Sequence, residues 1–149
     1  MLARDPARAG LPSGPLVEVV QGDLRVPATL PPALAGVRVV VSAVHGFAGP
    51  GRVTPKSVDR DGNANLVAAA KTAGADVVLM SVTGAAPDHA MELFRMKAAA
   101  ESTLCVSGVR WTVVRASAFL ELYRELLPRS AGKSARPMVS GGETIRSIS

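Results

Sequence analysis

The pattern of hydrophobic and polar positions changes period repeatedly along the chain. Short apolar runs rich in β-branched residues predict strands, and apolar positions spaced three or four apart predict helices. The predicted strands cover residues 17–21, 37–44, 76–82 and 111–115. The predicted helices cover about residues 28–35, 57–73, 91–107 and 118–127, with Gly36 and Gly74 at two helix ends. Strands that alternate with helices predict an α/β fold with a parallel sheet, and the unbroken apolar run at 37–44 predicts a strand covered on both faces.

Composition narrows the class of protein. The chain has 149 residues, the length of one domain, with 48% hydrophobic but only 3% aromatic residues. Too few aromatic rings are present for the stacking platforms of a single-strand nucleic-acid binder. Cys105 is the only cysteine, so we expect no internal disulfide, no cysteine-based metal site and a reducing, cytoplasmic location. We find neither an 18-residue apolar run nor a secretory signal at Met1, so we expect no membrane contact.

The net charge of +5 belongs mainly to the C-terminal end. Residues 129–149 carry four basic residues and one acidic residue, among many serines and glycines. We therefore expect a domain over residues 1–127 and a flexible basic tail over residues 128–149. Spread cations of this kind favour a solvated end over a nucleic-acid surface, and we expect no nucleic-acid partner.

Candidate chemistry follows the strands. Ligands of open α/β sheets bind beyond the carboxyl ends of the strands. Small or polar residues lie at or just after the carboxyl end of each predicted strand. Such residues let a ligand approach the backbone. The segments are Gly22-Asp23-Leu24, Ser42-Ala43-Val44, Ser81-Val82-Thr83-Gly84 and Arg115-Ala116-Ser117. The alternative is that these are ordinary turns, which favour the same residue types.

An ordered series of segments resembles the atypical short-chain dehydrogenase/reductases, and most closely their NmrA-like NAD(P)H-binding group. The similarity covers roughly residues 1–127. The segments are Val19–Leu24, Leu34–Ser42, Asp61–Ala70, Met80–Ala85, Lys97–Glu101 and Trp111–Arg115. The resemblance implies a Rossmann-like, doubly wound parallel sheet and NADP (or NAD) as cofactor.

The resemblance also implies a role for each matched residue. Asp23 would accept a hydrogen bond from the adenine amino group, and Leu24 would pack on the ring. Arg4 would bind the 2′-phosphate of NADP(H), for which a guanidinium is suited. The backbone of Ser42, Ala43 and Val44 would line the adenosine and ribose, while Ser81 and Gly84 would flank the nicotinamide. Lys97 would reach the nicotinamide ribose. Lys97 and Ser81 would be the candidate catalytic residues.

Other interpretations of these residues remain open. Asp23 could cap the helix that follows it. Lys97 could be an ordinary solvated helix lysine. Asn63 and Asn65 both fall within a predicted helix, where asparagine is unfavourable, so they require an explanation.

The sequence departs from the family pattern at the phosphate-binding turn. No strand, glycine-rich turn and helix precede residue 16, so we expect a partial fold that lacks the first strand. Residues 17–21 would then lie apart from the remaining strands. Residues 46–51 contain three glycines, but Pro50 has no amide proton and the predicted helix begins well after them.

A second departure concerns catalysis. Short-chain reductases commonly place a tyrosine four residues before the lysine, and here that position is Leu93. In its full-length form we expect an NAD(P)H-dependent oxidoreductase that transfers a hydride between NADP(H) and a small organic molecule of unknown identity, and that can form oligomers. The alternative is a regulatory module that senses the NAD(P) redox state without turnover.

Overall fold

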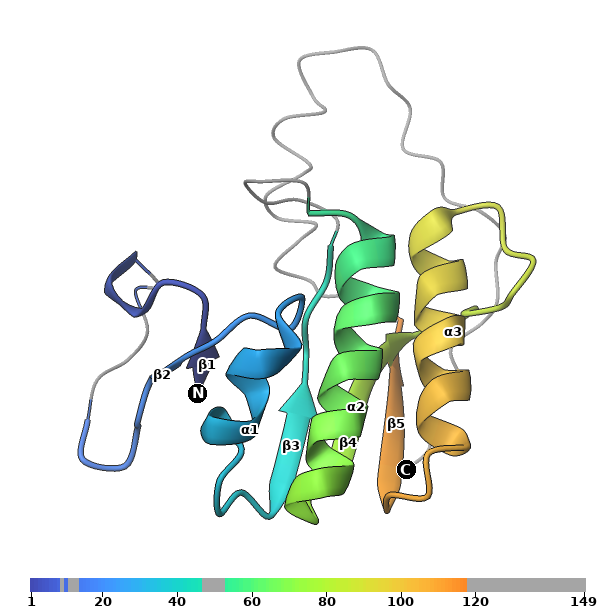
Figure 1. Cartoon of the computed structure of the whole chain (residues 1–149). Helices are drawn as coiled ribbons and strands as arrows, with labels where there is room; N and C mark the ends of the chain where they lie inside the picture. The colour runs from blue at the N-terminus through green and yellow to red at the C-terminus, as the bar shows by residue number, and fades with distance from the viewer. Residues whose placement is uncertain (9, 11–13, 47–52, 118–149) are drawn as a thin grey trace, which may run out of the picture. The chain divides into compact units, whose positions relative to one another are not determined.

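The computed structural model describes residues 1–8, 10, 14–46 and 53–117 (Figure 1). The chain divides into two units, Met1–Ser117 and Ala118–Ser149, and the first of these holds all the described residues. The helix expected at 118–127 and the tail expected at 128–149 lie outside the described residues.

Within the described residues, five strands form two parallel sheets. In the smaller sheet, β1 (Leu2–Ala3) pairs with β2 (Val20–Gln21). In the larger sheet, β4 (Asp76–Val82) lies between β3 (Val39–Ser42) and β5 (Trp111–Ala116). No described strand joins the two sheets, which confirms that the segment ending at Gln21 pairs apart from the three later strands.

Three α-helices connect or flank these strands. After β2, a 3-10 turn at Pro27–Thr29 leads into α1 (Leu30–Ala33). The long helix α2 (Asp61–Ala73) follows a π-helical turn at Lys56–Arg60. Along the chain, α3 (Glu92–Cys105) comes after β4 and before β5. Gly74 caps α2 in the left-handed conformation, with φ of 70°, as expected for a glycine at this position. In the described part of the chain, no helix is long and apolar enough to cross a membrane.

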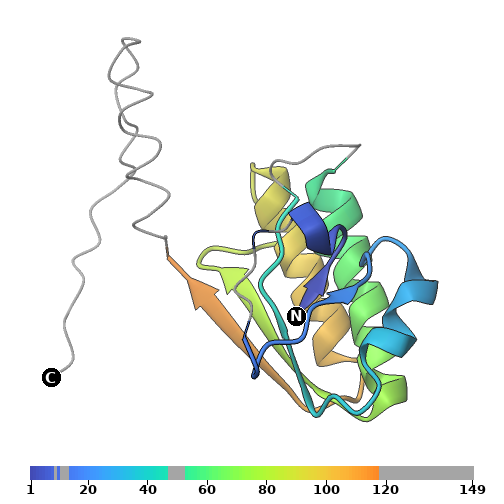
Figure 2. The same cartoon turned by 90° about the vertical axis from the view of Figure 1, so that its left-hand side faces the viewer.

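The core lies between one face of the larger sheet and the two long helices, which cover that face side by side (Figures 1 and 2). Val77 and Leu79 on β4 are 1% and 2% exposed. They belong to a cluster with aliphatic residues from α2 and α3, namely Leu66, Val67, Ala70, Ala100 and Leu104. The small alanines let the helices lie close to the sheet, as the aromatic-poor composition requires.

The opposite face of the larger sheet is open among the described residues. Val40 is buried, but its neighbours Val39 and Val41 are 51% and 64% exposed. Val114 on β5 faces the same side as Val41, because it aligns with Met80 on the open face of β4, and it is 40% exposed. The prediction that residues 37–44 are covered on both faces is therefore wrong for the described part of the structure. An unbroken apolar run indicates a parallel strand but does not reveal which of its faces a helix covers.

Candidate functional site

The first turns of α2 hold the carboxyl ends of β2 and β3. The side-chain amide of Asn65 donates to the carbonyl of Leu24, after β2, at 2.8 Å. Two residues earlier, Asn63 accepts a hydrogen bond of 2.6 Å from the hydroxyl of Ser42 at the end of β3. These contacts explain the two asparagines in the helix, and they join α2 to the loop after β2 and to the end of β3.

A buried ion pair holds the neighbouring ends of β3 and β4. The Lys97 ammonium lies 2.9 Å from Asp59 Oδ1 and donates to the carbonyls of Val44 (2.8 Å) and Met80 (3.1 Å). Asp59 is 0% exposed, and its Oδ2 accepts the Gly46 amide at 2.7 Å. The alternative that Lys97 is a solvated helix lysine is therefore wrong, since only 6% of the residue is exposed.

Asp59 could not be identified from the sequence as the partner of Lys97. The two residues are 38 positions apart, on different helical elements. All three ammonium protons of Lys97 have acceptors within hydrogen-bond distance. The lysine therefore fixes the two strand ends, and its geometry favours a structural role over exchange of a proton with a ligand.

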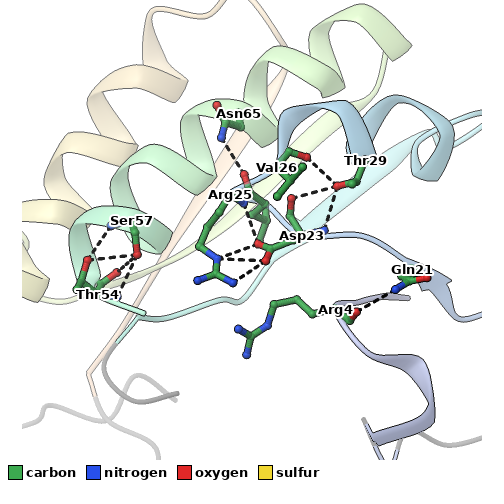
Figure 3. A network of polar contacts seen from close by, with 10 residues as sticks. Arg4, Gln21, Asp23, Arg25, Val26, Thr29, Thr54, Ser57 and Asn65 are labelled. Atoms are coloured by element: carbon green, nitrogen blue, oxygen red, sulfur yellow. Dashed lines mark hydrogen bonds and ion pairs between the residues drawn. The ribbon is translucent and has the colours of Figure 1, made fainter. Parts of the chain in front are cut away.

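The loop after β2 carries a second polar cluster, which Figure 3 shows. Arg25 Nη2 lies 2.7 Å from Asp23 Oδ2, and Arg25 Nε lies 3.1 Å from both carboxylate oxygens. The Arg25 amide also donates to Asp23 Oδ1 at 2.9 Å. The side-chain hydrogen bond from Arg25 is the largest cause that lowers the pKa of Asp23, with a smaller contribution from the charge of Arg4.

Asp23 therefore does not cap a helix through its side chain. The residue before the 3-10 turn is Val26, and the carboxylate of Asp23 faces the guanidinium of Arg25 instead. Thr29 supports the loop through its hydroxyl, which donates to the carbonyl of Val26 at 2.8 Å. Arg4 is exposed, and its side chain extends toward the Asp23–Arg25 pair (Figure 3).

A third cluster lies between α3 and the ends of β4 and β5. Arg115 Nη2 lies 2.6 Å from Glu101 Oε2, and Arg115 Nε lies 3.1 Å from Oε1. Burial acts to raise the pKa of Glu101, but the hydrogen bonds and the charge of Arg115 outweigh it, so the net pKa is lowered. Ser81 is 6% exposed, so its hydroxyl belongs to the packed layer under α3.

The predicted site residues thus share an edge but differ in accessibility. Ser42, Ser81 and Lys97 are buried. The accessible members are Arg4, Asp23, Leu24, Ala43, Val44 and Gly84. Gly84 has φ of 86° and lies beside the ring of Phe94, which stacks on His89 with centroids 4.1 Å apart. Exposed backbone and small side chains are what a ligand lying along this edge would meet.

The fit of a dinucleotide to these residues is best at its adenosine end. A carboxylate, an aliphatic side chain and guanidinium groups lie together after β1 and β2, as adenine and a phosphorylated ribose require. Of the glycine-rich residues 46–51, the segment that could replace the missing phosphate-binding turn, all but Gly46 lie outside the described residues. Among the described residues, no cluster of His, Cys, Asp or Glu could hold a metal ion.

A surface depression of about 370 Å³ lies at the opposite edge of the larger sheet. It is lined by residues at the amino ends of the strands, namely Arg38, Val39, Gly74, Asp76 and Arg110. Its position is unlike that of ligand sites in open α/β sheets, so we do not assign the cofactor to it.

Comparisons with known proteins identify the family of the chain. Residues 1–133 match the model of a family described as NAD(P)H-binding. The NAD(P)H azoreductase of Xenophilus azovorans is 34% identical over 145 residues, which are 94% of this chain and 47% of that protein.

Solved structures share the fold. The triphenylmethane reductase of Citrobacter sp. complexed with NADP(H) has a TM-score of 0.61 and 23% identity, over 78% of this chain and 39% of that one. The NADPH-dependent quinone oxidoreductase of Escherichia coli complexed with NADPH has a TM-score of 0.64 and 24% identity, over 87% of this chain and 43% of that one. The chain thus spans about half the length of the relatives it matches. The expected Rossmann-like α/β fold and the NAD(P)H-binding class are both confirmed.

Proposed function

This chain belongs to the NAD(P)H-binding family, and we propose that the edge at its strand ends binds NADP(H) for the reduction of a small conjugated organic acceptor. The observation that carries the proposal is the convergence of strand ends. The Asn63 and Asn65 contacts and the Lys97–Asp59 pair hold the ends of β2, β3 and β4 at one edge. A dinucleotide needs such a continuous edge, because its two nucleosides bind at separate strand ends.

At the adenosine end, Asp23 accepts a hydrogen bond from the adenine amino group and Leu24 packs against the ring. Arg4 binds the 2′-phosphate of NADP(H). The exposure of Arg4 and the orientation of its side chain toward Asp23 support this role (Figure 3). A guanidinium suits phosphate because it donates two parallel hydrogen bonds.

At the other end, the backbone of Ser42, Ala43 and Val44 lines the ribose side of the site. Ser81 and Gly84 flank the nicotinamide, and the exposed Gly84 leaves room for the ring. Lys97 is a positioning residue in this proposal, because its bonds to the carbonyls of Val44 and Met80 set the shape of the edge.

The reaction is a two-electron reduction. NADPH supplies the hydride when bound. A neutral azo or quinone acceptor also takes up one proton, whereas a cationic triarylmethane dye is reduced by the hydride alone. Leu93 stands where short-chain reductases commonly have tyrosine, so we propose that the proton comes from water. An electron-poor conjugated acceptor needs little acid assistance, and the relatives named for azo, quinone and triphenylmethane substrates support this class.

Loss of NADPH absorbance, measured for the full chain with an azo dye, a quinone and a triarylmethane dye, tests the proposal. We expect acceptor-dependent oxidation of NADPH. With the triarylmethane dye we also expect transfer of deuterium from 4-deuterated NADPH to the central carbon of the product, where it does not exchange with water. The departure at Leu93 favours a second candidate, a regulatory module that binds NAD(P) without turnover. Saturable NADPH binding with no oxidation in the presence of any acceptor would support that module and contradict the reductase.

A further inference from the structure

We propose that Arg25 is a second ligand of the 2′-phosphate, and that its move to the phosphate releases Asp23 to bind adenine. The inference rests on the proposed binding of NADP(H) and concerns how the chain distinguishes it from NAD(H). Arg25 comes from the loop after β2, whereas Arg4 follows β1, so the two guanidiniums approach Asp23 from different strands (Figure 3).

The carboxylate of Asp23 has little free capacity in the structure. A carboxylate offers about four acceptor positions. Arg25 makes four contacts with it, through the backbone amide, Nε to each oxygen and Nη2. An adenine amino group must therefore displace at least one contact from the Arg25 side chain before Asp23 can accept its proton.

The phosphate provides a reason for that displacement. The cluster holds two guanidiniums and one carboxylate, so it carries a net positive charge that attracts a phosphate group. The side chains of Arg25 and Asp23 are 28% and 20% exposed, so the pair is accessible to a ligand at the edge. The backbone bond from Arg25 to Asp23, at 2.9 Å, keeps the carboxylate in place when the side chain leaves.

This arrangement couples recognition of the phosphate to recognition of the base. Without a 2′-phosphate, adenine and Arg25 compete for the same carboxylate. With the phosphate bound, Arg25 has a new partner and the competition ends. Arg25 therefore favours ligands that carry both groups and disfavours those that carry only adenine.

Calorimetric titration of the full chain with adenosine 2′,5′-bisphosphate and with 5′-AMP tests the proposal, because these probes occupy only the adenosine end. For R25Q we expect affinity for the bisphosphate to fall about tenfold, whereas affinity for 5′-AMP stays equal or rises. R110Q is the matched control, since Arg110 Nη2 lies the same 2.7 Å from Asp76 Oδ2 at the opposite edge. R110Q should leave both affinities unchanged.

Hypoxanthine analogues, which lack the amino group, supply the test of coupling. In the unmodified chain the preference for adenine should be larger with the 2′-phosphate than without it, and in R25Q the two preferences should be equal.

Equal loss of affinity for the bisphosphate and for 5′-AMP in R25Q would overturn the inference, because it would indicate a merely structural role. No loss of either affinity would overturn it as well. If the unmodified chain shows no preference for the 2′-phosphate, the proposed selectivity for NADP(H) fails with it. If the chain oxidises NADPH and R25Q keeps the original preference for the 2′-phosphate, the proposed function stands and only the role of Arg25 is overturned.

Discussion

Lys97 joins the ends of two strands through a charge that has almost no contact with water. Its partner Asp59 is fully buried, and a buried carboxylate left without its cation is strongly destabilising. We predict that Lys97→Met lowers the free energy of unfolding by about 3–5 kcal/mol. Chemical denaturation measures this change, with Lys71→Met on the exposed side of α2 as the control, expected within about 0.5 kcal/mol of the original chain.

The double variant separates the pair from its surroundings. Adding Asp59→Leu to Lys97→Met should recover part of the loss, because apolar replacements of buried ion pairs are often tolerated. If the double variant loses the sum of the stabilities lost by Lys97→Met and Asp59→Leu alone, the two side chains act independently, contrary to the contact in the structure.

Two carboxylates link stability to pH. The pKa of Asp23 is lowered by Arg25, and that of Glu101 is lowered in net by Arg115 against the effect of burial. A lowered folded-state pKa stabilises the protein above the ordinary values of 3.8 and 4.5, and this contribution is lost as the pH falls through the folded-state values. We therefore predict that thermal stability decreases on acidification from about pH 6 to about pH 3.

Arg115→Gln isolates the part due to Glu101. Without the guanidinium, burial remains as the cause that raises the pKa of Glu101, so protonation costs less stability. The variant should be less stable near neutral pH and lose less on acidification. A pH profile parallel to that of the original chain would contradict the assigned ion pair.

At the scale of elements, two glycines differ in what a side chain would meet. A Cβ on Gly46 would lie 2.2 Å from the backbone oxygen of Thr54. The backbone amide of Gly46 also donates to the Asp59 carboxylate. A Cβ on Gly74 would meet nothing within 4 Å, so only its positive φ resists alanine. We predict that Gly74→Ala costs about 1–2 kcal/mol and that Gly46→Ala costs more.

Denaturant titration of the two glycine variants compares them. Hydrogen exchange should also show opening near Asp59 in Gly46→Ala but not in Gly74→Ala. Equal losses in the two variants would mean that the close approach of residues 46 and 54 does not exist in solution.

Strand β3 gives the clearest contrast between the two faces of the larger sheet. Val40 is 9% exposed and Val41 is 64% exposed, although the two residues are adjacent. Val40→Thr buries a hydroxyl, which costs about 1–3 kcal/mol, whereas Val41→Thr should stay within about 0.5 kcal/mol of the original chain. Equilibrium unfolding of both variants measures this, and a large loss in Val41→Thr would show that the open face is covered in solution.

At the scale of the whole molecule, local patterns predicted the long elements well. Residues 76–82 were expected as a strand and form β4 with the same bounds, because a β-branched run between polar ends has one strong local preference. The strand expected at 17–21 shrinks to Val20–Gln21, because its partner β1 offers only two residues for pairing. Strand length depends on the neighbour, which the local sequence does not contain.

The candidate site could be predicted only in part, for the same reason. Strand ends identify Asp23, Ser42 and Ser81, since topology alone brings them to one edge. The contacts that hold this edge join residues distant in sequence, so Asp59 and Glu101 carried no local signal. Asn63 and Asn65 did carry one, because their cost within a helix requires a compensating contact.

We propose that this chain binds NAD(P)H at the carboxyl edge of its strands. Backbone amide shifts recorded by NMR during titration with adenosine 2′,5′-bisphosphate test it most directly, because each residue reports separately. We predict the largest changes at Asp23, Leu24 and Arg25, with little change at Arg38, Gly74 and Arg110 on the opposite edge. Changes centred on those three opposite residues, or none anywhere at saturating ligand, would contradict the claim.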